Sequence, residues 1–156
     1  MMPVAAIMRV TPTTLRTLPP ASIAAFPGRF PWSPISTKDL TAALDIDPGA
    51  WTTWRNRRLT PPPLPAGWFR RATGGPLVYR ADTIRAWLAG RRGETYDALT
   101  DWQACLRTDF EEEASTPEQV RGHARMWASV AGPVVGEVRF TPAGFTAYLD
   151  NLLKAG

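Results

Sequence analysis

The 156-residue sequence is poor in the residues that build most metal and redox sites, because it holds one cysteine, Cys105, and one histidine, His123. A single cysteine excludes an intramolecular disulfide, and no cysteine–histidine spacing typical of zinc is present. Both residues fall in predicted helices, where packing or surface roles are the simpler interpretation. Gly74-Gly75 is not followed by the Lys-Ser/Thr of a phosphate-binding loop, and no nucleophile elbow occurs. We therefore expect a protein that is not an enzyme and that has no metal or cofactor.

Long hydrophobic runs are also missing. No stretch approaches the roughly 18 apolar residues that a membrane span requires. The apolar start, residues 1–7, lacks the basic beginning and the length of an export signal. With the single cysteine, this favours a cytoplasmic protein, in a bacterial host or associated with its nucleoid, and no membrane partner.

Acidic residues are nearly absent from one part of the chain. Residues 50–93 contain nine arginines and one acid, whereas residues 94–120 contain eight acids and one arginine. A basic block of this density is typical of nucleic-acid-binding proteins. Two other interpretations stay open: a solvated surface, or a basic face neutralised by the acidic segment folding back on it. Of the 18 basic residues 16 are arginine, a bias that GC-rich coding also produces.

The first 34 residues carry seven of the 16 prolines and no acid, which predicts an extended arm rather than a long helix. Its large apolar residues could pin the arm on the protein's own core, the favoured interpretation, or on a partner. These residues are Ile23, Phe26, Phe30 and Trp32.

Two short helices are predicted next. Ser36 is a good N-cap for a helix over 38–44, with Ile35 as a hydrophobic staple. Asp47, followed by Pro48, predicts the start of a second helix that runs to about residue 59. Tryptophans at 51 and 54 should turn this helix towards the core. Two short helices separated by a tight turn form a helix-turn-helix pattern.

The rest of the chain predicts a hairpin followed by helices. Runs rich in aromatic and β-branched residues flank Gly74-Gly75 within 67–80, which is a hairpin signal. Asp82 should cap a helix over 83–89. Further helices are expected over 94–113, from Ser115 or Thr116, and after Thr141-Pro142, with a possible strand at 134–140. The predicted fold is mainly α with a small β-hairpin (α+β), arranged as an arm (1–34), a winged helix-turn-helix (35–92) and a helical extension (93–156).

Several of these segments resemble a known family. Ile35-Ser-Thr-Lys-Asp-Leu-Thr-Ala-Ala-Leu44, Trp54-Arg-Asn-Arg-Arg58, the prolines that follow, Val78-Tyr-Arg80 and Ile84-Arg-Ala-Trp-Leu88 together resemble the excisionase-like members of the MerR-type superfamily. That family includes phage excisionases, recombination directionality factors and small phage or plasmid regulators. The resemblance covers residues 35–90 and implies a winged helix-turn-helix that binds DNA. This chain departs from the family pattern in having Arg58-Leu59 where glycine is common, and in its length.

The helix over 48–59 is then the candidate for the major groove. Thr53, Asn56 and Arg57 lie at i, i+3 and i+4, on one face. Asparagine can bind the N6/N7 edge of adenine and arginine the O6/N7 edge of guanine. Thr52 lies at the flank, and Arg55 and Arg58 are placed for phosphates. The helix N-terminus at residues 49–50 could add a backbone phosphate contact.

Three further residues belong to the predicted wing. Arg70, Arg71 and Thr73 lie near the Gly74-Gly75 tip, where they would meet the DNA backbone or minor groove. The alternative is a plain hairpin that covers the core.

These features predict sequence-specific binding of double-stranded DNA by a transcriptional regulator or excision factor of a phage or mobile element. Surplus apolar helix in 93–156 suggests a homodimer. The alternative function is a protein-interaction module that binds a recombinase or RNA polymerase and uses the helix-turn-helix as scaffold.

Overall fold

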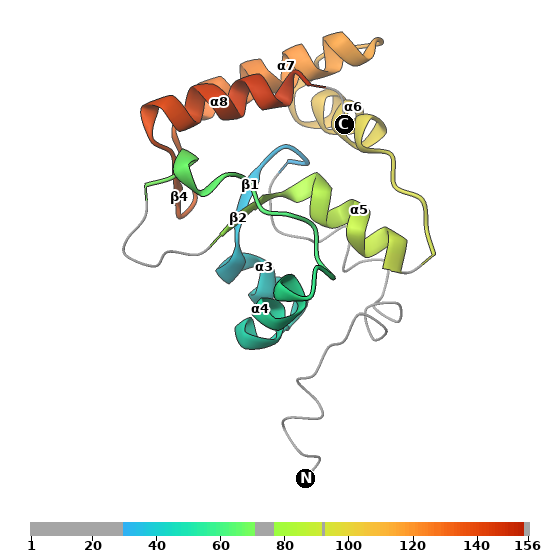
Figure 1. The fold of residues 1–156 in the computed structure, drawn as a ribbon. Helices are drawn as coiled ribbons and strands as arrows, with labels where there is room; N and C mark the ends of the chain where they lie inside the picture. Colours follow the sequence, from blue (N-terminus) through green and yellow to red (C-terminus); the bar gives the residue numbers. More distant parts are fainter. Residues whose placement is uncertain (1–29, 71–76, 92, 155–156) are drawn as a thin grey trace.

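The computed structural model describes residues 30–70, 77–91 and 93–154 (Figure 1). In chain order its elements are β1 (Pro34–Ser36), α3 (Thr37–Leu44), α4 (Pro48–Asn56), the 3₁₀ turn η2 (Ala66–Trp68), β2 (Val78–Arg80), α5 (Ala81–Arg91), α6 (Ala98–Phe110), α7 (Pro117–Ala131), β3 (Val134–Val135), β4 (Val138–Arg139) and α8 (Pro142–Leu152). The protein is therefore mainly helical with small antiparallel sheets, which confirms the predicted α+β class. Among the described helices, none has the length and apolar character to cross a membrane.

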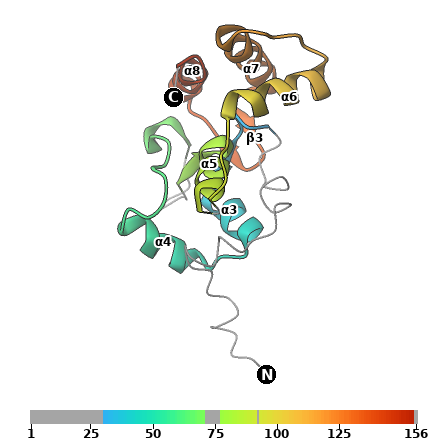
Figure 2. The ribbon, with the colours of Figure 1, turned by 90° about the vertical axis from the view of Figure 1, so that its right-hand side faces the viewer.

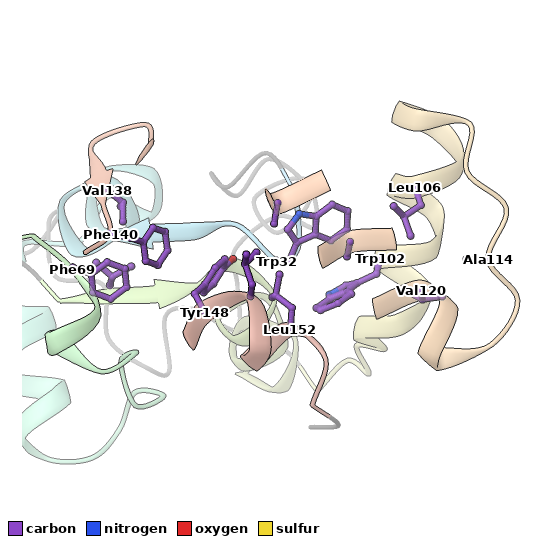
Figure 3. Close-up of a cluster of buried hydrophobic side chains, with 14 residues drawn as sticks. Trp32, Phe69, Trp102, Leu106, Ala114, Val120, Val138, Phe140, Tyr148 and Leu152 are labelled. Atoms are coloured by element: carbon purple, nitrogen blue, oxygen red, sulfur yellow. The ribbon is translucent and has the colours of Figure 1, made fainter. Parts of the chain in front are cut away.

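The helices lie at two ends of the molecule. Figures 1 and 2 show α6, α7 and α8 together at one end and α3 with α4 at the other, with β1, β2 and α5 between them. One buried cluster joins α3 and α4 to α5 and includes Leu40, Trp51 and Ile84. A second cluster combines Trp32 and Trp102 with residues from α7 and α8 (Figure 3). Segments 93–154 and 30–80 thus share a core.

The end of the predicted arm is part of that core. Trp32 is 2% exposed, stacks on Phe30 with ring centroids 5.1 Å apart, and meets Trp102 edge-on at 5.5 Å. Anchoring of the arm on the protein's own core is therefore confirmed for Phe30 and Trp32, whereas Ile23 and Phe26 lie outside the described residues. Ile35, predicted as a hydrophobic staple, belongs to strand β1 and lies in the same buried cluster as Leu40 of the following helix.

The predicted N-caps of α3 and α4 are confirmed. The Ser36 hydroxyl accepts a hydrogen bond from the Asp39 N–H, and the Asp47 carboxylate accepts one from the Ala50 N–H. Each bond satisfies a backbone donor that the first helical turn leaves open. Pro48 occupies the first position of α4, as predicted.

The end of α4 differs from the prediction, because the helix stops at Asn56 instead of reaching residue 59. The Leu59 N–H bonds to the Trp54 carbonyl and the Arg58 N–H to the Arg55 carbonyl, both at 2.9 Å. This is the bond pattern of a Schellman motif, which requires a left-handed residue between its two closing bonds. Arg58 supplies that residue with φ of 59°.

The prediction that two strands within 67–80 pair with each other as a hairpin is wrong. Strand β2 pairs antiparallel with β1, so that Tyr79 lies opposite Ile35, while Phe69 forms an isolated bridge with Phe140. The glycine pair and the alternation around it are local signals. They do not reveal that more distant segments offer buried partners, and strand pairing depends on such tertiary contacts.

Asp82 does not cap α5 as predicted. The helix starts at Ala81, directly after β2, and Asp82 is 2% exposed. Its carboxylate accepts hydrogen bonds from Arg80 and from the Trp102 Nε1–H instead. The Asp82 carboxylate binds the Arg80 guanidinium instead of a backbone N–H, because a hydrogen bond between two charged groups is stronger than one to a neutral amide.

The C-terminal elements follow the prediction with shorter bounds. Helix α6 covers 98–110 rather than 94–113, ending where Glu111 adopts φ of 57°. Thr116 and Gln119 form a capping box on α7, and Thr141 caps α8. The predicted strand at 134–140 is a tight hairpin, β3–β4, whose turn contains Gly136 with φ of 59°.

Candidate nucleic-acid interface

Helix α4 is held in one orientation by its two tryptophans. Trp51 is fully buried and Trp54 is 8% exposed. The Trp51 ring lies edge-on to Tyr79 and to Trp87, and its Nε1–H donates to the Tyr79 hydroxyl at 3.2 Å. Because both the rings and the indole N–H are engaged, the rotation of the helix about its axis is fixed.

The opposite side of α4 is open to solvent. Thr52, Thr53, Asn56, Arg57 and Arg58 are exposed and Arg55 is partly exposed. The placement on one face predicted for Thr53, Asn56 and Arg57 therefore agrees with the burial pattern. Within the described ranges, no ion pair engages the arginines of this face. The resulting surface, called here the α4 face, presents three unpaired guanidinium groups.

The acidic segment does not cover this face. Helix α6 lies at the far end of the molecule from α4 in Figure 1. Asp101 pairs with Arg85 at 2.8 Å, and Glu112 lies 3.1 Å from His123. Asp101 thus neutralises Arg85, so the interpretation in which the acidic segment folds back holds for that arginine of the basic block. Within the described residues, however, no acid pairs with the arginines of the α4 face.

The two threonines of the face have committed hydroxyl protons. Thr52 donates to the Pro48 carbonyl and Thr53 to the Gly49 carbonyl, each at 3.1 Å. With the proton used internally, each hydroxyl offers lone pairs outward and acts as an acceptor. Such oxygens suit the amino groups of cytosine or adenine in the major groove.

The predicted phosphate contact at the N-terminus of α4 is not supported by the geometry. The Ala50 N–H already bonds to the Asp47 carboxylate at 3.1 Å. Asp45 and Asp47 are both exposed, so the turn before α4 carries negative charge. The capping carboxylate thus takes the N–H group that a phosphate would bind, and its negative charge repels the phosphate.

The chain after α4 is fastened to the neighbouring helix. The Leu59 carbonyl accepts hydrogen bonds from the Trp87 Nε1–H at 3.0 Å and from Arg91 at 3.2 Å. The proline segment then runs beside β2, with the Leu64 N–H donating to the Val78 carbonyl. These bonds hold the C-terminal end of α4 and its arginines in place.

The residues predicted for the wing are only partly described. Arg70 is exposed, and its N–H donates to the Arg139 carbonyl at 2.7 Å. Arg71 and Thr73 lie outside the described residues. The structure therefore brings Arg70 to strand β4 of the C-terminal region. Sequence reasoning missed Arg139, because no local pattern links it to residue 70.

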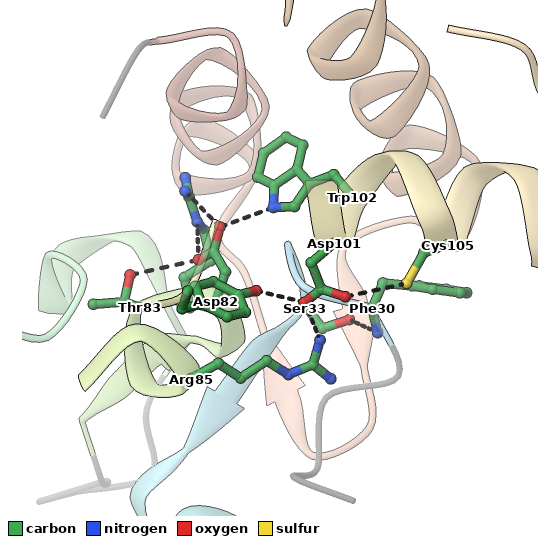
Figure 4. A network of polar contacts seen from close by, with 10 residues as sticks. Phe30, Ser33, Asp82, Thr83, Arg85, Asp101, Trp102 and Cys105 are labelled. Carbon is green, nitrogen blue, oxygen red and sulfur yellow. Dashed lines mark hydrogen bonds and ion pairs between the residues drawn. The ribbon is translucent and has the colours of Figure 1, made fainter. Parts of the chain in front are cut away.

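A separate polar network ties α5 to α6 (Figure 4). Arg80 binds the Asp82 carboxylate through two nitrogens and reaches Asn151, and Arg85 binds Asp101. Burial lowers the pKa of Arg80, but the hydrogen bonds and charge of Asp82 outweigh it and raise the pKa above its ordinary value. These arginines of the basic block serve the fold and are not available to a ligand.

Neither the cysteine nor the tyrosines of this region look reactive. Burial, with the nearby Asp101 charge, raises the pKa of the Cys105 thiol to about 11. Burial and the hydrogen bond to Asp101 raise the pKa of Tyr96 as well. A thiol with a raised pKa carries little thiolate at neutral pH. In the described part of the chain, no cluster of His, Cys, Asp or Glu is suited to a metal ion.

No protein-family model matches the chain, and neither the curated proteins nor the solved structures that were compared with it include a match.

Proposed function

We propose that the protein binds double-stranded DNA in a sequence-specific way through the α4 face. The observation that carries the proposal is the exposed set Thr53, Asn56 and Arg57 at the C-terminal end of a helix whose rotation the buried tryptophans fix. Asparagine and arginine on one rigid helical face can read base edges, at about 1–3 kcal/mol of discrimination for each bidentate contact. Arg55 and Arg58 flank that set and suit phosphates.

The biological role that fits is a transcriptional regulator or an excision factor of a phage or mobile element. Both roles use a protein that positions itself on a specific DNA site and performs no chemistry. They differ in what happens to the DNA, because an excision factor shapes it for a recombinase. A strongly bent complex in a gel-based bending assay would favour the excision role, and an unbent one would favour regulation.

We further propose a homodimer formed through the C-terminal region. Met126 and Val130, one turn apart on α7, are 45% and 73% exposed. Recognition of a palindromic site by a two-fold pair requires the two α4 faces to meet half-sites about one helical turn of DNA apart. Sedimentation of the full chain alone and on DNA measures the stoichiometry, and a monomer under both conditions would refute the dimer.

The salt dependence of binding separates this function from a protein-interaction role. Several arginine–phosphate contacts predict that affinity for random duplex DNA falls steeply as salt rises, with a logarithmic slope of about −0.9 for each phosphate neutralised. A flat response or absence of binding would instead support a module that binds a recombinase or polymerase.

Substitutions on the α4 face test the assignment of roles. Selection of bound fragments from random duplex DNA first defines the preferred site. Asn56→Ala and Arg57→Ala should then each relax the preference at particular base pairs, by about 1–3 kcal/mol. Arg55→Ala is the matched control, because loss of a phosphate contact weakens binding to all sequences about equally. If Asn56→Ala and Arg57→Ala leave the preference unchanged, the reading face is misassigned.

A further inference from the structure

A pair of arginines forms a second cationic site away from α4. Phe69 and Phe140 bridge as antiparallel neighbours, and the Arg70 N–H donates to the Arg139 carbonyl. In this register Arg70 and Arg139 lie directly opposite each other, on the side of the strands away from the two buried phenylalanines. Both arginines are exposed.

Among the residues that the structure describes, no acid lines the surroundings of this pair. Arg70 and Arg139 line a hollow of about 430 Å³ whose other walls are Pro133, Val134, Phe140, Pro142 and Phe145. Across the described part of the molecule, neither arginine takes part in an ion pair. The nearest acidic neighbour in sequence, Glu137, pairs with Lys38.

Two like charges directly opposite on paired strands repel each other and destabilise the pairing. The positive end of helix α8, which begins at Pro142 beside the hollow, adds to the same potential. Such an arrangement costs stability unless something negative binds between the guanidinium groups. Arginine suits a phosphate there, because its planar fork can donate two hydrogen bonds to one anion.

We propose that Arg70 and Arg139 together bind a phosphate group, and that this phosphate belongs to the backbone of the DNA bound at α4. This inference rests on the proposed DNA-binding function and adds a C-terminal residue to its interface. The segment that follows α4 crosses the molecule to reach β4 and α8 (Figure 1), and α4 and this segment occupy the same edge of the molecule in Figure 2. Arg139 on the β3–β4 hairpin thus contacts the DNA backbone, which is the role that the sequence suggested for a wing at 67–80.

The first test measures DNA affinity as a function of salt for the full chain. Arg139→Ala should weaken binding to every sequence about equally and make the logarithmic salt slope shallower by about 0.9, the value for one lost phosphate contact. Arg70→Ala should do the same, and the double variant should cost less than the product of the two single losses if one phosphate is shared. Arg121→Ala on α7 is the matched control and should leave the slope unchanged.

A second measurement distinguishes DNA phosphate from a free anion. Inorganic phosphate at millimolar concentration should raise the melting temperature of the wild-type protein more than that of Arg139→Ala if the pair binds phosphate of any source. Phosphate stabilisation without any effect of Arg139→Ala on DNA affinity would overturn the DNA assignment and indicate a site for a free anion. No effect of Arg139→Ala in either experiment would overturn the site itself.

Charge reversal provides a check that does not depend on a loss of folding. Arg139→Glu places an acid opposite Arg70, so the melting temperature without ligand should rise or stay the same while DNA affinity falls. Failure of this inference is distinct from failure of the proposed function. If only this inference fails, the α4 variants still change sequence preference and Arg139→Ala has no effect. If the proposed function fails, the wild-type protein binds no DNA.

Discussion

Arg58 shows how one residue can serve both the fold and the surface. Its φ of 59° closes the Schellman motif at the end of α4, a conformation that glycine adopts without cost and other residues do not. The backbone at Arg58 is therefore strained, at the end of the helix that carries the exposed arginines.

Arg58→Gly should therefore stabilise the protein by about 1 kcal/mol, since the left-handed conformation costs an ordinary residue roughly that amount. Urea unfolding measures the change. Arg57→Gly is the matched control: Arg57 has φ of −87°, so glycine there should give no gain. If Arg58 also contacts phosphate, the stabilised variant binds all DNA sequences more weakly. Equal stability of wild type and Arg58→Gly would argue against strain at this residue.

At the scale of elements, α4 is the part of the molecule whose two faces differ most in role. Its inner face is fixed by indole rings, its outer face carries free polar groups, and its N-terminus is closed by Asp47. The cap stabilises the helix but places a negative charge where the helix end would attract phosphate. If α4 binds DNA as proposed, the stability of the helix and its affinity for DNA are opposed at this residue.

Asp47→Asn should separate the two effects, because asparagine caps a helix about as well as aspartate but carries no charge. We expect unchanged stability and tighter binding to all DNA sequences, measured by thermal unfolding and by titration at low salt. Asp47→Ala should lose about 1 kcal/mol of stability through loss of the cap. An unchanged DNA affinity in Asp47→Asn would show that the turn before α4 lies away from the duplex.

At the scale of the whole molecule, residues 30–91 and the C-terminal helices are joined by buried contacts. Trp102 of α6 contacts both Trp32 and the Asp82 carboxylate, and Arg80 extends from β2 to Asn151 of α8. The guanidinium of Arg80 also lies 5.2 Å from the Trp102 ring. Removing one partner from a buried charge network strongly lowers stability, because the other partner is left buried without its counter-charge.

Asp82→Ala should destabilise the full chain by about 3 kcal/mol, since it leaves Arg80 and the Trp102 N–H without their acceptor. Chemical denaturation monitored by tryptophan fluorescence measures the loss. Thr83→Ala is the control, because it removes only a long hydrogen bond of 3.5 Å to the Asp82 carboxylate and should change stability by less than about 1 kcal/mol. A small effect of Asp82→Ala would mean that the junction depends on apolar packing alone.

Features that depend on neighbours along the chain could be predicted from the sequence. Ser36, Asp47, Thr116 and Thr141 are caps because each can reach a backbone N–H within three residues. Helical spacing likewise placed the tryptophans of α4 inward and its polar face outward. For these reasons the α+β class and the candidate DNA-contacting face could be predicted from the sequence.

Tertiary structure decided which distant groups meet. The partner of β2 is β1 and the neighbour of Arg70 is Arg139, pairings across long sequence separations that no local pattern encodes. Asp82 had the signature of a cap, yet a buried guanidinium and an indole N–H claimed its carboxylate. Arg80 is only two residues away in the sequence, but burial strengthens its charge-assisted bond, and the fold brings the distant Trp102 to the same carboxylate. These contacts prevailed over the local preference of the aspartate for capping.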